Sequence, residues 1–190
     1  DLYAATPRNG TTSALIMKII SLKYGLLGAV AVVIYFFLVY TAKKELFLNP
    51  VAQWSSMVIY LALMVKASMD DVAVNGANRD FREIVRAPFT VFVLINLGYW
   101  MFYYGLHLAD PELLSMELGQ QLAFLKKQLT DGTGDPEQAA KIREQIQNLE
   151  VTKDLKQPLG PVLLQMSMGA LGGFALSAAI AAAMRFKQND

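Results

Sequence analysis

Residues 24–40 read YGLLGAVAVVIYFFLVY and contain no charged side chain. An α-helix rises about 1.5 Å per residue, so about 20 apolar residues cross the roughly 30 Å hydrocarbon core of a bilayer. Residues 19–22, and a Lys23 side chain that reaches up to the headgroups, make this stretch long enough to span. Three further apolar stretches follow at residues 51–69, 88–108 and 162–184. The sequence therefore predicts an all-α integral membrane protein with four transmembrane helices.

The composition supports this class. Of the 190 residues, 54% are hydrophobic and 17% are charged, whereas a soluble domain carries about 25% charged residues. This balance excludes an ordinary soluble enzyme domain and a disordered chain. The formal net charge is +1, far from the basic balance of a nucleic-acid binder, so we expect no nucleic-acid partner.

The sequence carries no recognisable set of catalytic residues. It has no cysteine and one histidine, which excludes disulfides, thiolate-ligated metals and any multi-histidine metal or haem site within this chain. No glycine-rich phosphate loop, His-Glu-x-x-His or Gly-x-Ser-x-Gly pattern occurs. We therefore expect a protein that is not an enzyme, and we assign no catalytic residue, cofactor or metal.

One substantial polar segment, residues 110–157, separates the third apolar stretch from the fourth. Two series of apolar residues at spacings of three and four lie within it, on either side of a glycine-rich break at 131–136: Leu118, Leu122, Leu125, Leu129, and then Ile142, Ile146, Leu149. The spacing predicts an extramembrane antiparallel helical hairpin held by a narrow apolar seam. Asp135 is expected to cap its second helix, with Pro136 in the first turn.

The remaining boundaries follow from the spans. Residues 1–14 are polar and are predicted to form an irregular lead-in. Residues 15–109 hold the first three transmembrane helices, with residues 80–86 as a short helix entering the third. Residues 158–190 hold the fourth helix and a tail.

Charge sets the predicted orientation. Lysine and arginine collect on the cytoplasmic side of membranes. Four spans place both termini on one side, which would hold most of the basic residues outside the hairpin, while the hairpin itself has nine acidic residues against six basic ones. We therefore expect a multi-pass protein of the bacterial inner membrane with both termini cytoplasmic. The hairpin would lie outside, which is the periplasm in a bacterium with two membranes.

Small residues recur every four positions along the last apolar stretch, at Gly169, Gly173, Ser177 and Ala181. Such a ridge lets another helix approach closely. Two interpretations follow: an interface with a partner protein, or packing against the other helices of the same chain. Ridges of this kind are common within single chains, which favours the second.

Three arginines precede the third span, at Arg79, Arg82 and Arg86. If the stretch is helical they share a face, where they would contact the phosphate of an anionic lipid or a lipid-linked sugar carrier. The alternative is the ordinary excess of basic residues on the cytoplasmic side, partly neutralised by Asp80 and Glu83.

Three other polar residues stand out in the spans. Asn96 is placed near the middle of the third span and is expected to bond to another helix, with Gln165 and Ser167 as candidate partners. Lys66 is expected to pair with Asp70 one turn later. His107, beside Asp110, is expected to form an interfacial hydrogen bond; a pH-sensitive or catalytic role is the alternative.

Several short motifs carry a resemblance to a known family. Residues 23–26 (KYGL) open the first span, residues 80–84 (DFREI) precede the third, and residues 108–111 (LADP) lead into the helical insert, with a Gly/Ala-rich last span. In these features the chain resembles the domain-of-unknown-function 4199 family (DUF4199), small four-span membrane proteins of Bacteroidota. The resemblance assigns no activity, but it implies gene neighbours that are polyprenyl-phosphate glycosyltransferases and hence such an enzyme as a partner.

Three hypotheses on function follow. The first is a non-catalytic accessory subunit of a larger membrane complex, with other membrane protein subunits as partners. It would dock through the small-residue face of the last helix and through the hairpin. The second is handling of anionic lipids or polyprenyl-phosphate sugars, alone or with a glycosyltransferase. The third is a small proton-coupled transporter, supported only by Lys66, Asn96 and His107.

Overall fold

The computed structural model describes residues 10–76, 79–131, 136–152 and 159–186, which form helices and no strand. Four long helices pack together: α1 (Gly10–Ala42), α4 (Met57–Asn75), α5 (Phe81–Ala109) and α8 (Leu159–Phe186). Two short helices, α2 (Lys44–Phe47) and α3 (Pro50–Ser55), join α1 to α4. The remaining two are α6 (Pro111–Thr130) and α7 (Pro136–Thr152). The expected all-α class is confirmed for these residues.

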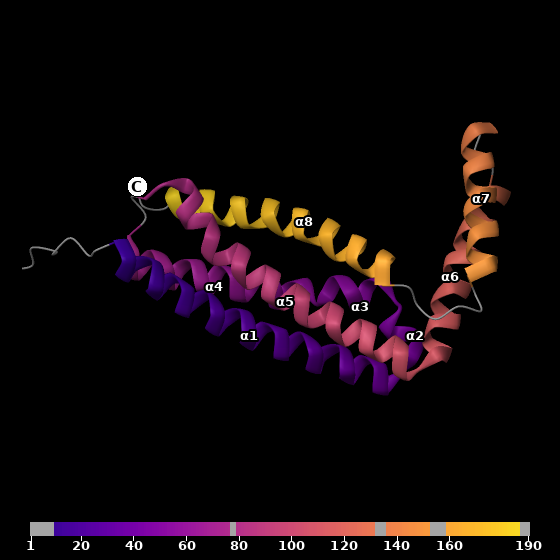
Figure 1. Ribbon diagram of the computed structural model, residues 1–190, viewed down its shortest axis with the longest axis horizontal. Coiled ribbons are helices and arrows are strands. Elements are labelled where there is room, and N and C mark those ends of the chain that lie inside the picture. Colours follow the sequence, from indigo (N-terminus) through magenta and orange to yellow (C-terminus); the bar gives the residue numbers. More distant parts are fainter. Residues whose placement is uncertain (1–9, 77–78, 132–135, 153–158, 187–190) are drawn as a thin grey trace, which may run out of the picture.

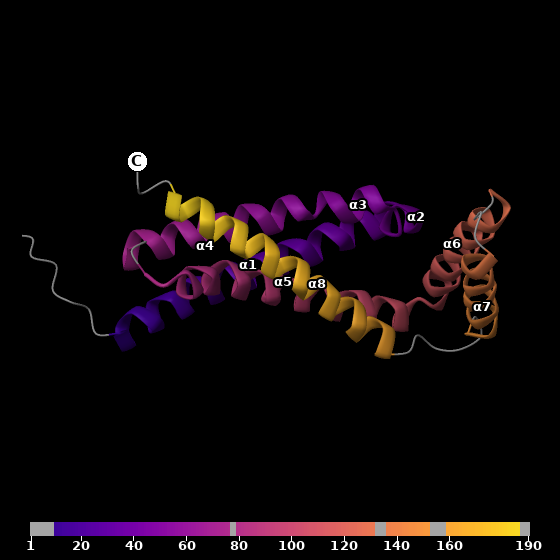
Figure 2. The ribbon, with the colours of Figure 1, turned by 90° about the horizontal axis from the view of Figure 1, so that it is seen from above.

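The four long helices lie side by side in one bundle, and α5 is its centre, in contact with α1, α4 and α8 (Figures 1 and 2). The described chain starts and finishes at the same end of this bundle, which we call the terminal end; α2 lies at the opposite end (Figure 1). Both views show α6 and α7 projecting beyond that opposite end. We call this pair of helices the arm.

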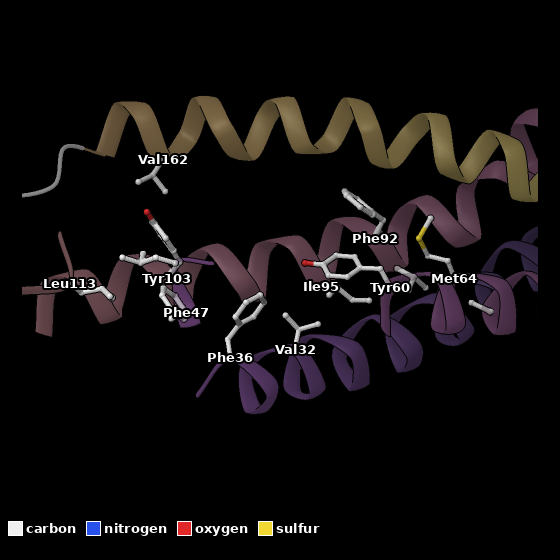
Figure 3. Packing of buried hydrophobic residues seen from close by; sticks show 13 residues of the cluster. Val32, Phe36, Phe47, Tyr60, Met64, Phe92, Ile95, Tyr103, Leu113 and Val162 are labelled. Carbon is white, nitrogen blue, oxygen red and sulfur yellow. The ribbon is translucent and has the colours of Figure 1, made fainter. Parts of the chain in front are cut away.

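The core of the bundle runs along its length, as Figure 3 shows. Val32 and Phe36 of α1, Met64 of α4, and Phe92 and Ile95 of α5 are buried in it. The core is thin, because four helices of the described residues form the bundle and each of them keeps an outward face.

Three of these helices are long and apolar enough to cross a membrane among the described residues: 15–42 in α1, Phe81–Ala109, and 162–186 in α8. Their outward faces carry large exposed side chains such as Leu26, Phe37 and Leu171. Exposing such apolar faces to water would cost free energy, whereas lipid chains solvate them. The protein is a membrane protein.

The predicted second span, residues 51–69, is divided between α3 and α4 with a break at Ser56. The carbonyl of Ala52 accepts hydrogen bonds from the hydroxyls of Tyr35 and Ser55. Side chains that bond to helical carbonyls in this way interrupt the backbone ladder. Helix α4 also carries Lys66, Asp70 and Asp71, which leaves it more polar than its three neighbours.

Two predicted boundaries differ from those of the structure. Helix α1 already begins at Gly10, so residues 10–14 belong to the helix and not to an irregular lead-in; residues 1–9 lie outside the described residues. The short helix predicted at residues 80–86 is the first part of α5, which runs on through Pro88. Asp80 caps it by accepting from the backbone N–H of Arg82. Burial of Pro88 and its neighbours in the bundle offsets the backbone hydrogen bond that a proline cannot donate.

Close packing of α1 on α5 depends on glycines. A Cβ at Gly25 would lie 2.4 Å from the Leu94 side chain, and one at Gly28 would lie 2.4 Å from Ile95. A Cβ at Gly98 would lie 2.7 Å from that of Ala29. These contacts bring the two backbones closer than larger residues would allow, as is usual between membrane helices.

In the arm, α6 packs against α7. All seven residues of the predicted seam are buried or half-buried, and Leu118, Leu122 and Ile142 are the most deeply buried. Lys126 and Glu150 form an ion pair across the two helices, with 3.0 Å between Nζ and Oε1. Helix α7 begins at Pro136; its predicted cap, Asp135, lies outside the described residues.

Candidate functional site

The small-residue face of α8 is turned into the bundle. Ser177 and Ala181 are fully buried, and a Cβ at Gly173 would lie 2.1 Å from the ring of Phe92 on α5. At Gly169 it would lie 3.6 Å from the side-chain oxygen of Asn96. The face therefore packs on this chain's own helices. The prediction that a partner docks on this face is wrong for this structure. The opposite face of α8 exposes Leu164, Met168 and Leu171.

Asn96 bonds to α8, but not through the expected side chains. Its amide nitrogen donates to the backbone carbonyl of Met166 over 3.3 Å. The expected partner Ser167 donates instead to the carbonyl of Leu163 in its own helix. The interhelical hydrogen bond was predicted correctly and its acceptor was not.

The three arginines do not form one face. Arg79 precedes the first residue of α5, and its Nη2 lies 2.6 Å from Oδ2 of Asp71 on α4. Asp71 is fully buried and also accepts a hydrogen bond from Asn75. Arg79 thus neutralises a buried carboxylate and is not free for lipid, whereas Arg82 and Arg86 are exposed one helical turn apart.

A cluster of tyrosine, aspartate and lysine joins α1 to α4 toward the terminal end. The hydroxyl of Tyr24 donates to Asp70, and Nζ of Lys66 lies 2.6 Å from the other carboxylate oxygen. The expected Lys66–Asp70 pair is confirmed. Lys23 lies over the Tyr24 ring, 5.6 Å from its centroid.

The same three residue types recur at the opposite end. The hydroxyl of Tyr40 donates to Asp110 over 2.7 Å, and Nζ of Lys44 lies 2.8 Å from the same oxygen and 2.6 Å from Glu112. The Lys44 ammonium, followed by the Tyr40 hydroxyl, holds the pKa of Asp110 below its usual range. In return Asp110 and Glu112 raise the pKa of Lys44. This cluster ties α1 and α2 to the start of the arm.

His107 forms hydrogen bonds, as expected, with one partner on α6 and one on its own helix. Its Nε2 lies 2.9 Å from Oε2 of Glu117 on α6, and its Nδ1 lies 2.9 Å from the carbonyl of Tyr103. The hydroxyl of Tyr103 also donates to Glu117. The His107 side chain has no exposed area, and the rings of Phe47 and Tyr103 pack on it.

A groove runs along the arm between α6 and α7. It is lined by amide and apolar side chains: Gln121, Phe124, Leu125, Gln145, Asn148 and Leu149. Phe124 is 62% exposed although it lies in a helix that is mostly polar. Its ring is thus accessible at the groove, next to the apolar seam of the two helices.

Together, these polar groups bind one another at the two ends of the bundle. Within the described residues, no set of three or more histidine, aspartate or glutamate side chains is placed to hold a metal ion. The titratable side chains form pairs and triads between helices, and these arrangements join elements of the fold.

Three comparisons with known proteins were made. Neither a search of curated proteins nor a search of solved structures found a match. Residues 23–185 match the family model described as "Protein of unknown function (DUF4199)", which covers most of the chain. The chain therefore belongs to the DUF4199 family.

Proposed function

We propose that the protein is a non-catalytic accessory or scaffolding subunit of a larger bacterial inner-membrane complex, and that it binds its partner through the arm. The observation that carries this proposal is Phe124, a large apolar ring exposed at the groove of a helical pair that projects from the bundle. An aromatic ring at a groove is the type of anchor that dominates binding energy at protein interfaces.

The proposed topology has four crossings, by α1, α3 with α4, α5, and α8. Both termini would be cytoplasmic, with the arm as a periplasmic antiparallel hairpin. The support is that the described chain starts and finishes at one end of the bundle. That end carries exposed basic residues, among them Arg82, Arg86 and Arg185, in the sense of the positive-inside rule.

A photo-crosslinking experiment tests the docking role. A photoreactive amino acid at position 124 is expected to crosslink one stoichiometric membrane partner, such as a polyprenyl-phosphate glycosyltransferase. The matched control is position 127, an exposed lysine on the same helix outside the groove. Phe124→Ser should then release the partner in mild detergent, while Lys127→Ser should retain it. Equal crosslinking at both positions, or a partner retained by Phe124→Ser, would overturn the proposal.

The second candidate function is handling of an anionic lipid or a polyprenyl-phosphate sugar at the terminal end. Arg82 and Arg86 support it because they are exposed on one face of α5 at the point where it leaves the apolar bundle. The guanidinium group of a single arginine binds a phosphate through two parallel N–H···O hydrogen bonds. Replacing both with alanine should reduce bound anionic lipid in native mass spectrometry, and Arg143→Ala on the arm serves as control. Unchanged lipid occupancy would exclude this role for Arg82 and Arg86.

The transporter hypothesis has the least support. Lys66, Asn96 and His107 bind three separate partners, on α4, α8 and α6 respectively. A coupled transporter needs its polar groups to converge on one site near the midplane. Substrate-dependent proton movement in proteoliposomes would support the transporter hypothesis.

A further inference from the structure

The base of α6 is fixed to the bundle by contacts on one of its faces. The Leu113 side chain has no exposed area and belongs to the core of the bundle. One turn later, Glu117 accepts a hydrogen bond from the Tyr103 hydroxyl and lies 2.9 Å from Nε2 of His107, both on α5. The ion pairs of Lys44 with the first turn of α6 add to these contacts. The direction in which α6 leaves the bundle is therefore fixed at several points.

This direction places the arm across the long axis of the bundle. Figure 1 shows α6 and α7 standing crosswise to the four long helices, and Figure 2, viewed from above, shows the same two helices foreshortened. In the topology proposed above, the long helices cross the membrane. The arm then runs along the membrane surface, immediately beyond the end of the bundle.

The face of α6 that contacts the bundle continues beyond it to Phe124. Four residues follow one another on this side of the helix at spacings of four, three and four: Leu113, Glu117, Gln120 and Phe124. Leu122 of the seam comes nine residues after Leu113, about two and a half turns, and so lies on the opposite side, against α7. Phe124 therefore faces away from α7, toward the side on which the membrane lies.

The groove of the arm opens next to this ring. The five side chains that line it with Phe124 are likewise uncharged: Gln121, Leu125, Gln145, Asn148 and Leu149. The groove follows two helices that run along the membrane surface, so it runs along that surface as well. Glu144, by contrast, is exposed on the side of α7 that faces away from α6 and from the membrane.

We propose that the groove binds an uncharged, amphipathic helix of the partner that lies in the headgroup layer beside the bundle. The inference rests on the proposed function and names the segment of the partner that the arm recognises. A groove between two helices fits a third helix, whose apolar residues at spacings of three and four contact Phe124, Leu125 and Leu149. The amides of Gln121 and Gln145 offer hydrogen bonds to its polar side.

Spin labels test whether the arm lies along the membrane. Single cysteines replace Lys127, one turn after Phe124 on α6, or Glu144 on the far side of α7, and both positions are exposed. The full-length protein is placed in nanodiscs whose lipid headgroups carry chelated Ni²⁺, which speeds the relaxation of nearby labels. We expect a several-fold larger effect at position 127, since packed helices lie about 8–10 Å apart. An equal or larger effect at position 144 would overturn the proposal.

Mapping the crosslink from position 124 identifies the segment that binds. The crosslinked peptide, identified by mass spectrometry, should lie directly next to a transmembrane segment of the partner. A peptide from a soluble domain of the partner, or from a second copy of this chain, would overturn this inference and leave the docking role of the arm intact. Capture of no protein at all would contradict the proposed function itself.

A matched pair of charge substitutions tests the groove as the binding site. Gln145→Glu places a carboxylate in the uncharged groove, whereas Gln147→Glu places it on the same helix at an exposed position outside the groove. We expect Gln145→Glu to lower recovery of the crosslinked partner by at least about tenfold, because burying an unpaired charge is costly. Recovery with Gln147→Glu should stay at the wild-type level. Equal recovery with the two variants would overturn the proposal.

Discussion

At the scale of single residues, the contact of Gly173 with Phe92 is the tightest in the bundle that a substitution can probe. Gly173→Ala would place a Cβ 2.1 Å from a ring that is itself buried against Tyr60. We expect a loss of about 1–3 kcal/mol in the free energy of unfolding, the usual cost of overpacking. Thermal unfolding in detergent, monitored by circular dichroism, measures this loss of stability.

The neighbouring glycine supplies the control. A Cβ at Gly172 would meet nothing within 4 Å, and this residue is exposed. Gly172→Ala should be neutral or slightly stabilising, because alanine is the better helix former by about 0.5–1 kcal/mol. If both variants unfolded at the same temperature, the packing of α8 on α5 would differ from that described here.

Also at this scale, Asp110 and Lys44 predict a pH window for the start of the arm. Because the pKa of Asp110 is lowered in the folded protein, its contribution to stability is complete above its unfolded pKa, about 3.9. This contribution is lost as pH falls through the folded pKa. Because the pKa of Lys44 is raised in the folded protein, its contribution to stability is complete below its unfolded pKa, about 10.4. This contribution is lost as pH rises through the folded pKa. The tie between α2 and α6 should therefore hold from about pH 4 to about pH 10.

Hydrogen exchange in the first turn of α6 measures this tie. Lys44→Ala should speed exchange there at neutral pH by no more than about fivefold, since exposed ion pairs contribute little. The adjacent Lys43 is exposed, and the described structure gives it no ion pair. Lys43→Ala is thus the matched control, and equal effects of the two substitutions would argue against the tie.

At the scale of elements, the pair of Asp71 and Arg79 fixes how α4 is joined to α5. Asp71 is fully buried, so removing Arg79 leaves the Asp71 carboxylate unpaired by any cation in apolar surroundings. We expect Arg79→Ala to lower the free energy of unfolding by about 3–5 kcal/mol. Adding Asp71→Asn should restore part of the loss, because no charge is then left unpaired. Chemical unfolding in detergent measures both variants.

Arg82→Ala provides the comparison for this prediction. Arg82 is exposed on α5, three residues after Arg79, and its loss should change the free energy of unfolding by no more than about 0.5 kcal/mol. A double variant no more stable than Arg79→Ala would show that Arg79 stabilises by packing and not by its charge.

Helices with a strong apolar period were predictable from sequence, whereas their interruptions were not. The seam of the arm was predicted residue by residue, because spacings of three and four define one helical face. At the break at Ser56, the carbonyl of Ala52 accepts from Tyr35 of another helix as well as from the local Ser55. Continuation of α5 through Pro88 depends on burial in the bundle. The bond from Tyr35 and the burial of Pro88 are tertiary effects that local pattern does not encode.

The same limit applies to the polar contacts. Lys66 and Asp70 were paired correctly because they are four residues apart on one helix. Glu117 was missed as the partner of His107, since the pairing depends on the angle at which α6 leaves Asp110. The burial of Asp71 was not predicted, because an acidic residue at a helix end is usually exposed. One signal was present: Asp71 lies next to Asp70, and two adjacent aspartates cannot both lie on the same face of a helix.

At the scale of the whole molecule, the bundle predicts where each part is accessible. The chain has no cysteine, so single cysteines can be placed freely. Lys127→Cys on the arm should react with a membrane-impermeant maleimide in intact spheroplasts. Phe186→Cys, which is exposed at the terminal end, should react only after lysis. The reverse pattern would invert the proposed topology, and labelling of both in intact spheroplasts would exclude four crossings.

The two tyrosine–aspartate–lysine clusters have a further consequence for the surrounding lipid. Tyr24 and Tyr40 are sixteen residues apart on α1, about 24 Å at the helical rise. If both clusters lie at headgroup level, this distance is shorter than the roughly 30 Å of an average bilayer, so hydrophobic mismatch arises at a cost of a fraction of a kcal/mol per Å. The lipid around the bundle would thin to match it. We expect longer-chain lipids to increase this deformation and to bring the base of the arm closer to the membrane surface.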